Sequence, residues 1–137
     1  MKVKPLRGAR GQELVEFALT LPIMILLLMG IFDMGRVVIY YSSLHNAVRE
    51  GARYGIVHGG PKEIDKDRVG VKNRVVNMAI GLGPDFDSSD VEIPEWDDKV
   101  IRVRATYMFS PVTPLIGRFL TGGKIQLVGS SRMWVEY

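Results

Sequence analysis

The sequence predicts an α+β protein in which a long N-terminal helix packs on a small antiparallel sheet of about three strands, with a second helix beside it. Residues 17–32 carry no charge, and apolar side chains keep a helical spacing well beyond this run. Residues 64–80 repeat a shorter helical pattern. Apolar and polar residues alternate over residues 99–109 and 125–137, as in strands with one buried face.

Composition narrows the functions open to the chain. Its 137 residues are 47% hydrophobic and 24% charged, which suits one small domain plus a membrane segment and fits neither disorder nor several membrane spans. The absence of cysteine excludes disulfides, thiolate catalysis and metal sites with cysteine ligands. The net charge of +3 arises mostly from Lys2, Lys4, Arg7 and Arg10, so it does not indicate nucleic-acid binding.

The apolar run predicts a membrane span. Leu14 to Phe32 is about nineteen residues, enough for a helix to cross ~30 Å of hydrocarbon. Because basic residues precede it, we expect the N-terminus in the cytoplasm and the rest outside. Pro22 predicts a kink, which membrane helices tolerate. Glu16 lies near the start of the run, where a carboxylate is costly without a partner. Neither a cleavable signal peptide, with an apolar core of about 7–15 residues, nor a plain uncleaved anchor explains this acid.

The same helix is expected to continue outside the membrane, over residues 12–57 in all. Its predicted buried face consists of apolar and small residues at spacings of three and four: Val37, Tyr41, Leu44, Val48, Gly51, Ala52 and Gly55. Ala47, Gly51 and Gly55 are small and four residues apart, so a sheet could approach closely there. Residues 58–61 contain two glycines and a proline that end the helix.

The remainder reads as a small sheet with its connections. Residues 91–93 form a short strand that Pro94 limits, which is typical of a sheet edge. Residues 99–109 are the clearest strand, and residues 125–137 are the last one. A short helix is expected at 115–120. The central strand directs alternate side chains toward the core: Ile101, Val103, Ala105, Tyr107 and Phe109.

The sequence contains no recognisable catalytic constellation. His45 and His58 are thirteen residues apart and match no metal-binding spacing, and no phosphate loop or nucleophile elbow occurs. We therefore predict no enzyme activity and no cofactor. Asp85, Asp87 and Asp90 leave open a weak calcium site, since hard cations take several oxygen ligands, but Asx turns explain the same residues.

Two segments carry a more specific pattern. Residues 11–17 read GQELVEF, in which a glycine stands five residues before a glutamate that an aromatic residue follows. Residues 47–54 read AVREGARY. The first segment resembles the processing site of class III prepilins. With the second, the chain resembles the TadE-like minor pilins, or pseudopilins, of the tight-adherence (Tad/Flp, type IVc) pilus system, most strongly over residues 7–55.

The resemblance implies a division of the chain into three parts. A prepilin peptidase would cleave between Gly11 and Gln12 on the cytoplasmic side and remove residues 1–11 as a basic leader. Residues 12–33 would be the transmembrane helix, and residues 34–137 a pilin-like extracytoplasmic domain.

The resemblance also implies roles for individual residues. The Glu16 carboxylate would pair with the new Gln12 amine of a neighbouring subunit, which offsets the cost of the buried charge and sets the axial register. Phe17 stands where the major pilins of this class carry tyrosine, which indicates a minor subunit. Pro22 would permit local unwinding when the subunit leaves the bilayer, and residues 14–32 would pack in the fibre core.

The implied function is that of a structural minor pilin, acting in assembly, priming or capping of a Tad-type pilus for adherence. Its expected partners are the prepilin peptidase, sister minor and major pilins, the inner-membrane assembly platform and membrane lipid. It would cross the cytoplasmic membrane once, or enter a surface pilus. The alternative is an uncleaved bitopic anchor presenting a small extracytoplasmic binding domain, in which residues 7–11 survive and Glu16→Ala is nearly neutral.

Overall fold

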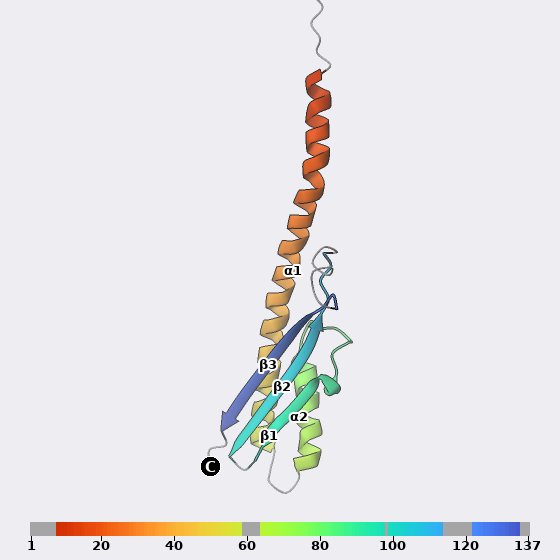
Figure 1. Ribbon diagram of the computed structural model, residues 1–137. Coiled ribbons are helices and arrows are strands. Elements are labelled where there is room, and N and C mark those ends of the chain that lie inside the picture. Colours follow the sequence, from red (N-terminus) through yellow and green to blue (C-terminus); the bar gives the residue numbers. More distant parts are fainter. Residues whose placement is uncertain (1–7, 59–63, 98, 114–121, 135–137) are drawn as a thin grey trace, which may run out of the picture.

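One long helix, α1 (Gly8–His58, 51 residues), determines the shape of the molecule (Figure 1). The computed structural model describes residues 8–58, 64–97, 99–113 and 122–134. At 1.5 Å per residue α1 is about 75 Å long. It begins four residues before the predicted start and ends one residue after the predicted end. Pro22 lies inside it without ending it, because one missing N–H costs a single hydrogen bond in a long helix.

The C-terminal half of α1 packs on the rest of the chain, with a face slightly different from the predicted one. Leu44 and Val48 are fully buried, as expected. Tyr41, however, is 49% exposed, and Tyr40 packs instead, with its ring centroid 5.7 Å from that of Phe109. The packed face therefore runs from Val37 to Tyr40, three residues on, and then to Leu44, four residues on. Both spacings keep the side chains on one face of the helix.

The second helix, α2 (Ile64–Met78), packs beside α1 and ends two residues before the predicted Ile80. Val71 and Val75 are fully buried. Beyond the helix end the Ile80 N–H donates to the Met78 carbonyl at 2.9 Å. Gly81 then takes a φ of +90°, which side-chain-bearing residues rarely adopt, and this leads the chain out of the helix.

Three antiparallel strands form the sheet in the order β1-β2-β3: β1 (Val91–Trp96), β2 (Val100–Phe109) and β3 (Ile125–Trp134). β2 and β3 pair without a break along all ten residues. β1 is an edge strand, as Pro94 predicts, but it is longer than expected. Pro94 lies within it, where the register with β2 shifts between Glu92 and Glu95. A proline fits there because an edge strand has positions that need no donor.

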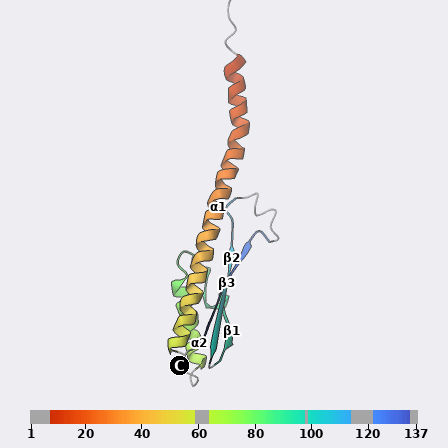
Figure 2. The same cartoon turned by 90° about the vertical axis from the view of Figure 1, so that its left-hand side faces the viewer.

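Both helices cover the same face of the sheet, and the core lies between the two layers (Figure 2). The central strand contributes the predicted inward residues, of which Ile101, Val103, Ala105 and Phe109 are fully buried. A Cβ at Gly55 would collide with the Ile101 side chain of the sheet, which supports the predicted close approach. A Cβ at Gly51 would instead collide with Val75 of α2. The small residues of α1 therefore face two different neighbours.

The connection from β2 to β3 is described only in part. Gly122 and Gly123 both have positive φ, at +81° and +69°, and form the turn that starts β3. The predicted short helix at 115–120 and the predicted strand residues 135–137 lie outside the described residues. The architecture is the α+β arrangement that the sequence predicts.

Candidate functional site

The predicted processing and assembly residues lie together on the exposed first turns of α1. Gly11, Gln12, Glu16 and Phe17 are all helical and exposed. A Cβ at Gly11 would meet nothing within 4 Å, so neither packing nor a positive φ explains a glycine here. Gln12 and Glu16 are one helical turn apart and share a face. The structure therefore presents these residues free of the folded domain, where another protein can reach them.

The following segment has the properties of a membrane span. Among the described residues, α1 is the one helix long and apolar enough to cross a membrane, and none of its most apolar stretch is buried within the molecule. Leu14 is 69% exposed and Phe32 72% exposed, at the two ends of the predicted span. So large an apolar surface is stable only against lipid or another protein.

Pro22 lies within this span, and α1 runs through it. The Thr20 hydroxyl donates to the Glu16 carbonyl at 2.7 Å, a contact that ties a side chain to the turn before the proline. Such bonds to the preceding turn are often found where helices bend. Pro22 thus remains the weakest point of the backbone ladder in the span.

The apolar surface of α1 continues past the predicted span. Met34, Val38 and Ile39 are between 61% and 66% exposed. Val38 and Ile39 also line an open groove of about 610 Å³, whose other side is formed by Met78 at the end of α2 and by the exposed Ile80 that follows it. Exposed apolar patches of this kind commonly mark protein interaction sites.

Asp33 ends the apolar run and is buried, with 4% of its surface exposed. Its Oδ2 accepts the Thr113 N–H at 2.8 Å and the Thr113 hydroxyl at 2.7 Å. Its Oδ1 accepts the Val112 N–H at 3.0 Å and pairs with Arg36 Nη1 at 3.3 Å. These bonds satisfy a buried carboxylate, which would otherwise be costly. They fasten the segment after β2 to α1 where the predicted span ends.

Arg36 completes this junction from the next turn of α1. Its guanidinium carbon lies 5.0 Å from the Phe109 ring centroid and 5.6 Å from that of Tyr40. Cations bind favourably to aromatic faces at these distances. Arg36 therefore joins α1 to the end of β2.

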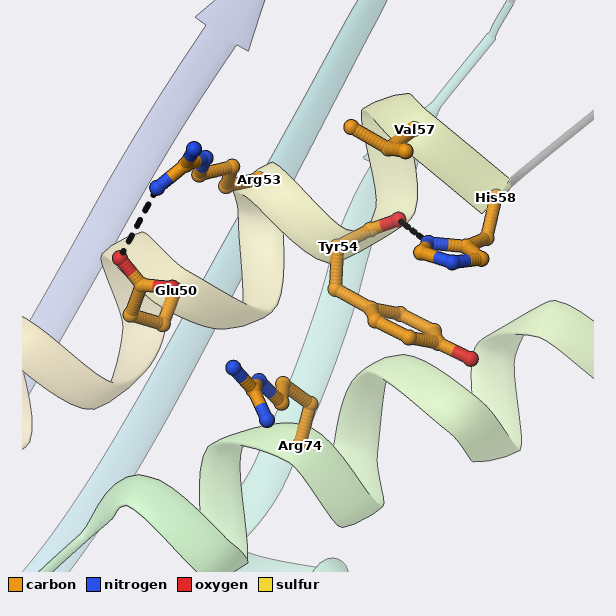
Figure 3. A pocket seen from close by; sticks show the side chains of 6 residues that line it. All are labelled: Glu50, Arg53, Tyr54, Val57, His58 and Arg74. Atoms are coloured by element: carbon orange, nitrogen blue, oxygen red, sulfur yellow. Dashed lines mark hydrogen bonds and ion pairs between the residues drawn. The ribbon is translucent and has the colours of Figure 1, made fainter.

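A shallow hollow of about 310 Å³ lies between α1 and α2 at the end of α1 away from the N-terminus (Figure 3). The His58 ring stacks on the Tyr54 ring with 4.2 Å between their centroids, and His58 Nδ1 donates to the Tyr54 carbonyl at 3.2 Å. Arg53 Nη1 lies 3.8 Å from Glu50 Oε1, and Arg74 points into the hollow from α2 (Figure 3). These groups stabilise the helix end and contain no nucleophile activated by a base.

The acidic loop before β1 uses its side chains locally. Asp87 and Asp90 form a capping box around the 3₁₀ turn Ser88–Asp90. The Ser89 hydroxyl and N–H hold the pKa of Asp87 below its ordinary value. Among the side chains that the structure describes, no three histidine, aspartate or glutamate residues are grouped to hold a metal ion. The hydrogen bonds of Asp87 and Asp90 support the Asx-turn interpretation of this loop.

The sheet face opposite the helices carries a small charged cluster. Glu95 on β1 pairs with Arg102 on β2 at 3.4 Å and with Arg132 on β3 at 3.0 Å. Arg102 and Arg132 are directly opposite in the register, so the shared carboxylate offsets their repulsion. At the turn into β2, the N–H groups of Lys99 and Val100 hold the pKa of Asp97 below its ordinary value.

Comparison with known proteins finds one family. The model of the family described as TadE-like protein matches residues 11–53. No curated protein and no solved structure matches the chain significantly. The match begins at Gly11, covers the predicted span and ends within the packed half of α1. The resemblance to TadE-like proteins is therefore confirmed over these residues, and the match is consistent with a protein of the Tad pilus system.

Proposed function

We propose that this chain is a structural minor pilin of a Tad-type pilus, made as a precursor whose leader a prepilin peptidase removes after Gly11. One observation carries the proposal: the TadE-like match over residues 11–53 coincides with a helix that leaves the folded domain and exposes its apolar side chains. The role is structural rather than catalytic, and its site is a surface for insertion and packing.

Processing is the first step of the proposed mechanism. Residues 1–11 contain four cations, which keep the N-terminus on the cytoplasmic side. Their removal takes away the charges that hold α1 in the membrane. Cleavage also creates an α-amino group on Gln12, one helical turn from Glu16. Residues 12–33 remain in the inner membrane and residues 34–137 stay outside until the subunit assembles.

Assembly is the second step. Within one subunit Glu16 is exposed near the start of the apolar run. In a bundle of such helices its carboxylate would leave water, and the Gln12 amine of a neighbour supplies the opposite charge. The apolar residues of the span, with the groove at Val38 and Ile39, then pack against sister pilins. The inner-membrane assembly platform acts on this helix, and priming or capping of the pilus is the role we assign to the subunit.

Replacing the glycine before the cleavage site tests processing. We expect Gly11→Leu to leave the full-length precursor in the membrane and to abolish the subunit's contribution to piliation, because the peptidase must accommodate the residue next to the cleaved bond. Gly8→Leu, within the leader, serves as the matched control and should be processed normally. Membrane fractions blotted for the subunit, with pili counted by electron microscopy, give the readout. Normal processing of Gly11→Leu would contradict the role of Gly11 in cleavage, and retention of the leader in the unmodified chain would overturn the proposal in favour of an uncleaved anchor.

A further inference from the structure

The junction around Asp33 separates two parts of α1 with different surroundings. Asp33 is the first buried residue in the described part of α1, and the following contacts come from Arg36, Val37 and Tyr40. Before Asp33, side chains such as Phe17 and Leu27 are more than 60% exposed. The domain therefore begins to hold α1 at Asp33.

The hydrogen bonds that fix Asp33 are charge-assisted and come from residues far along the chain. Thr113 lies 80 positions further along the chain, after the end of β2, and contributes two hydrogen bonds to one carboxylate oxygen. Val112 contributes a third bond to the other oxygen. Bonds to an ionised acceptor are stronger than neutral ones, and their burial protects them from competing water. Unwinding α1 through Asp33 would break all of them together.

We propose that Asp33 and Thr113 form a stop that confines unwinding of α1 to the segment before residue 33. The proposal rests on the proposed function, since unwinding matters when the subunit leaves the bilayer. Pro22 removes a backbone hydrogen bond within the span, so helix opening begins there most readily. Once the segment is out of lipid and a break exists, each further residue costs little to unwind. A tertiary contact at residue 33 raises that cost sharply, and the domain stays folded while the helix before it rearranges.

Hydrogen exchange of the full chain in lipid nanodiscs tests this stop. In Asp33→Asn, we expect the amides of residues 34–40 to exchange on the order of ten- to a hundredfold faster than in the unmodified chain. The amides of residues 44–56, which the core holds independently, should be unchanged. Asp97→Asn is the matched control, because Asp97 also accepts two backbone N–H groups but lies at the turn into β2. It should leave residues 34–40 unaffected.

A milder variant keeps the test decisive if Asp33→Asn unfolds the domain. Thr113→Val removes only the hydroxyl bond at 2.7 Å and keeps both backbone donors. It should accelerate exchange in residues 34–40 several-fold, with the remaining domain protected. Unchanged exchange at 34–40 in both variants, or equal acceleration across 44–56 in Thr113→Val, would overturn the proposal.

The mass of the same samples separates this proposal from the proposed function. If the leader is retained when the peptidase is present but residues 34–40 respond as expected, the pilin assignment fails and the stop stands as the boundary of a membrane anchor. If the leader is removed but residues 34–40 do not respond, the stop fails and the pilin assignment stands.

Discussion

The two halves of α1 belong to one continuous helix, yet they meet opposite surroundings. From Gly11 to Phe32 nearly every large side chain is exposed. From Leu44 to Gly55, one face is buried against α2 and the sheet. From Phe17 to Phe32 the first half is uncharged and apolar all round, as a segment in lipid or in a helix bundle must be. The second half is apolar on one stripe only, as a helix covering a sheet must be. The comparison shows how one helix can serve both a membrane or fibre core and a folded domain.

The largest effect is expected when the Glu16 carboxylate is removed from the exposed half of α1. We predict that Glu16→Ala is processed normally but lowers the number of pili by about tenfold or more, because losing one partner of the proposed Glu16–Gln12 pair would cost roughly 3–5 kcal/mol once that pair is buried. Glu13→Ala, with the same change three residues earlier, is the matched control and should have a much smaller effect. Leader removal is followed by mass and piliation by microscopy. Wild-type piliation in Glu16→Ala would remove the pairing role from this residue.

A smaller effect is expected in the packed half. Gly51→Ala places a methyl group against the buried Val75 side chain, and overpacking of this kind destabilises by about 1–3 kcal/mol. Gly35→Ala is the matched control, since its Cβ would meet nothing within 4 Å. It should be neutral or stabilise by up to about 1 kcal/mol through helix propensity. Urea titration in detergent, followed by tryptophan fluorescence, measures both; equal stability of the two variants would contradict the packing described here.

The smallest effect concerns the turn into β2, far from α1's exposed half. The pKa of Asp97 is lowered by the Lys99 and Val100 N–H groups, so the folded state favours the ionised form. Its contribution to stability is present above the ordinary value of 3.8 and is lost as the pH falls through the lower folded-state pKa. We predict that Asp97→Asn is slightly less stable than the unmodified chain at pH 7 and that the difference shrinks as the pH falls below 3.8. Urea midpoints measured at neutral and acidic pH test this; a difference that does not shrink in acid would contradict it.

The sequence predicted the parts of the fold that local patterns determine. The apolar run over residues 17–32 and the alternation over residues 99–109 each depend only on neighbours in the chain, and the structure has a helix over the first and a strand over most of the second. The membrane span itself stays a prediction. Tyr40 and Tyr41 are adjacent, so a spacing rule could not decide which of them packs. Only the position of Phe109 decides it.

The candidate site likewise has one part that local sequence predicts and one part that depends on distant residues. Gly11 and Glu16 are predicted from a local motif and their roles stay predictions, although the family match begins at Gly11. The junction at Asp33 was missed, because its partner Thr113 lies 80 positions away and nothing local marks it. A usable signal was present: an acid that ends an apolar run, with Arg36 one turn later, is costly unless it has a partner.

The intact mass of the membrane-extracted protein, with the native prepilin peptidase present and absent, tests the central claim most directly. The account predicts a peptidase-dependent loss of the mass of Met1 to Gly11, which leaves Gln12 as the N-terminal residue. Retention of the leader in both samples would contradict it, and α1 would then be the uncleaved anchor of an extracytoplasmic domain.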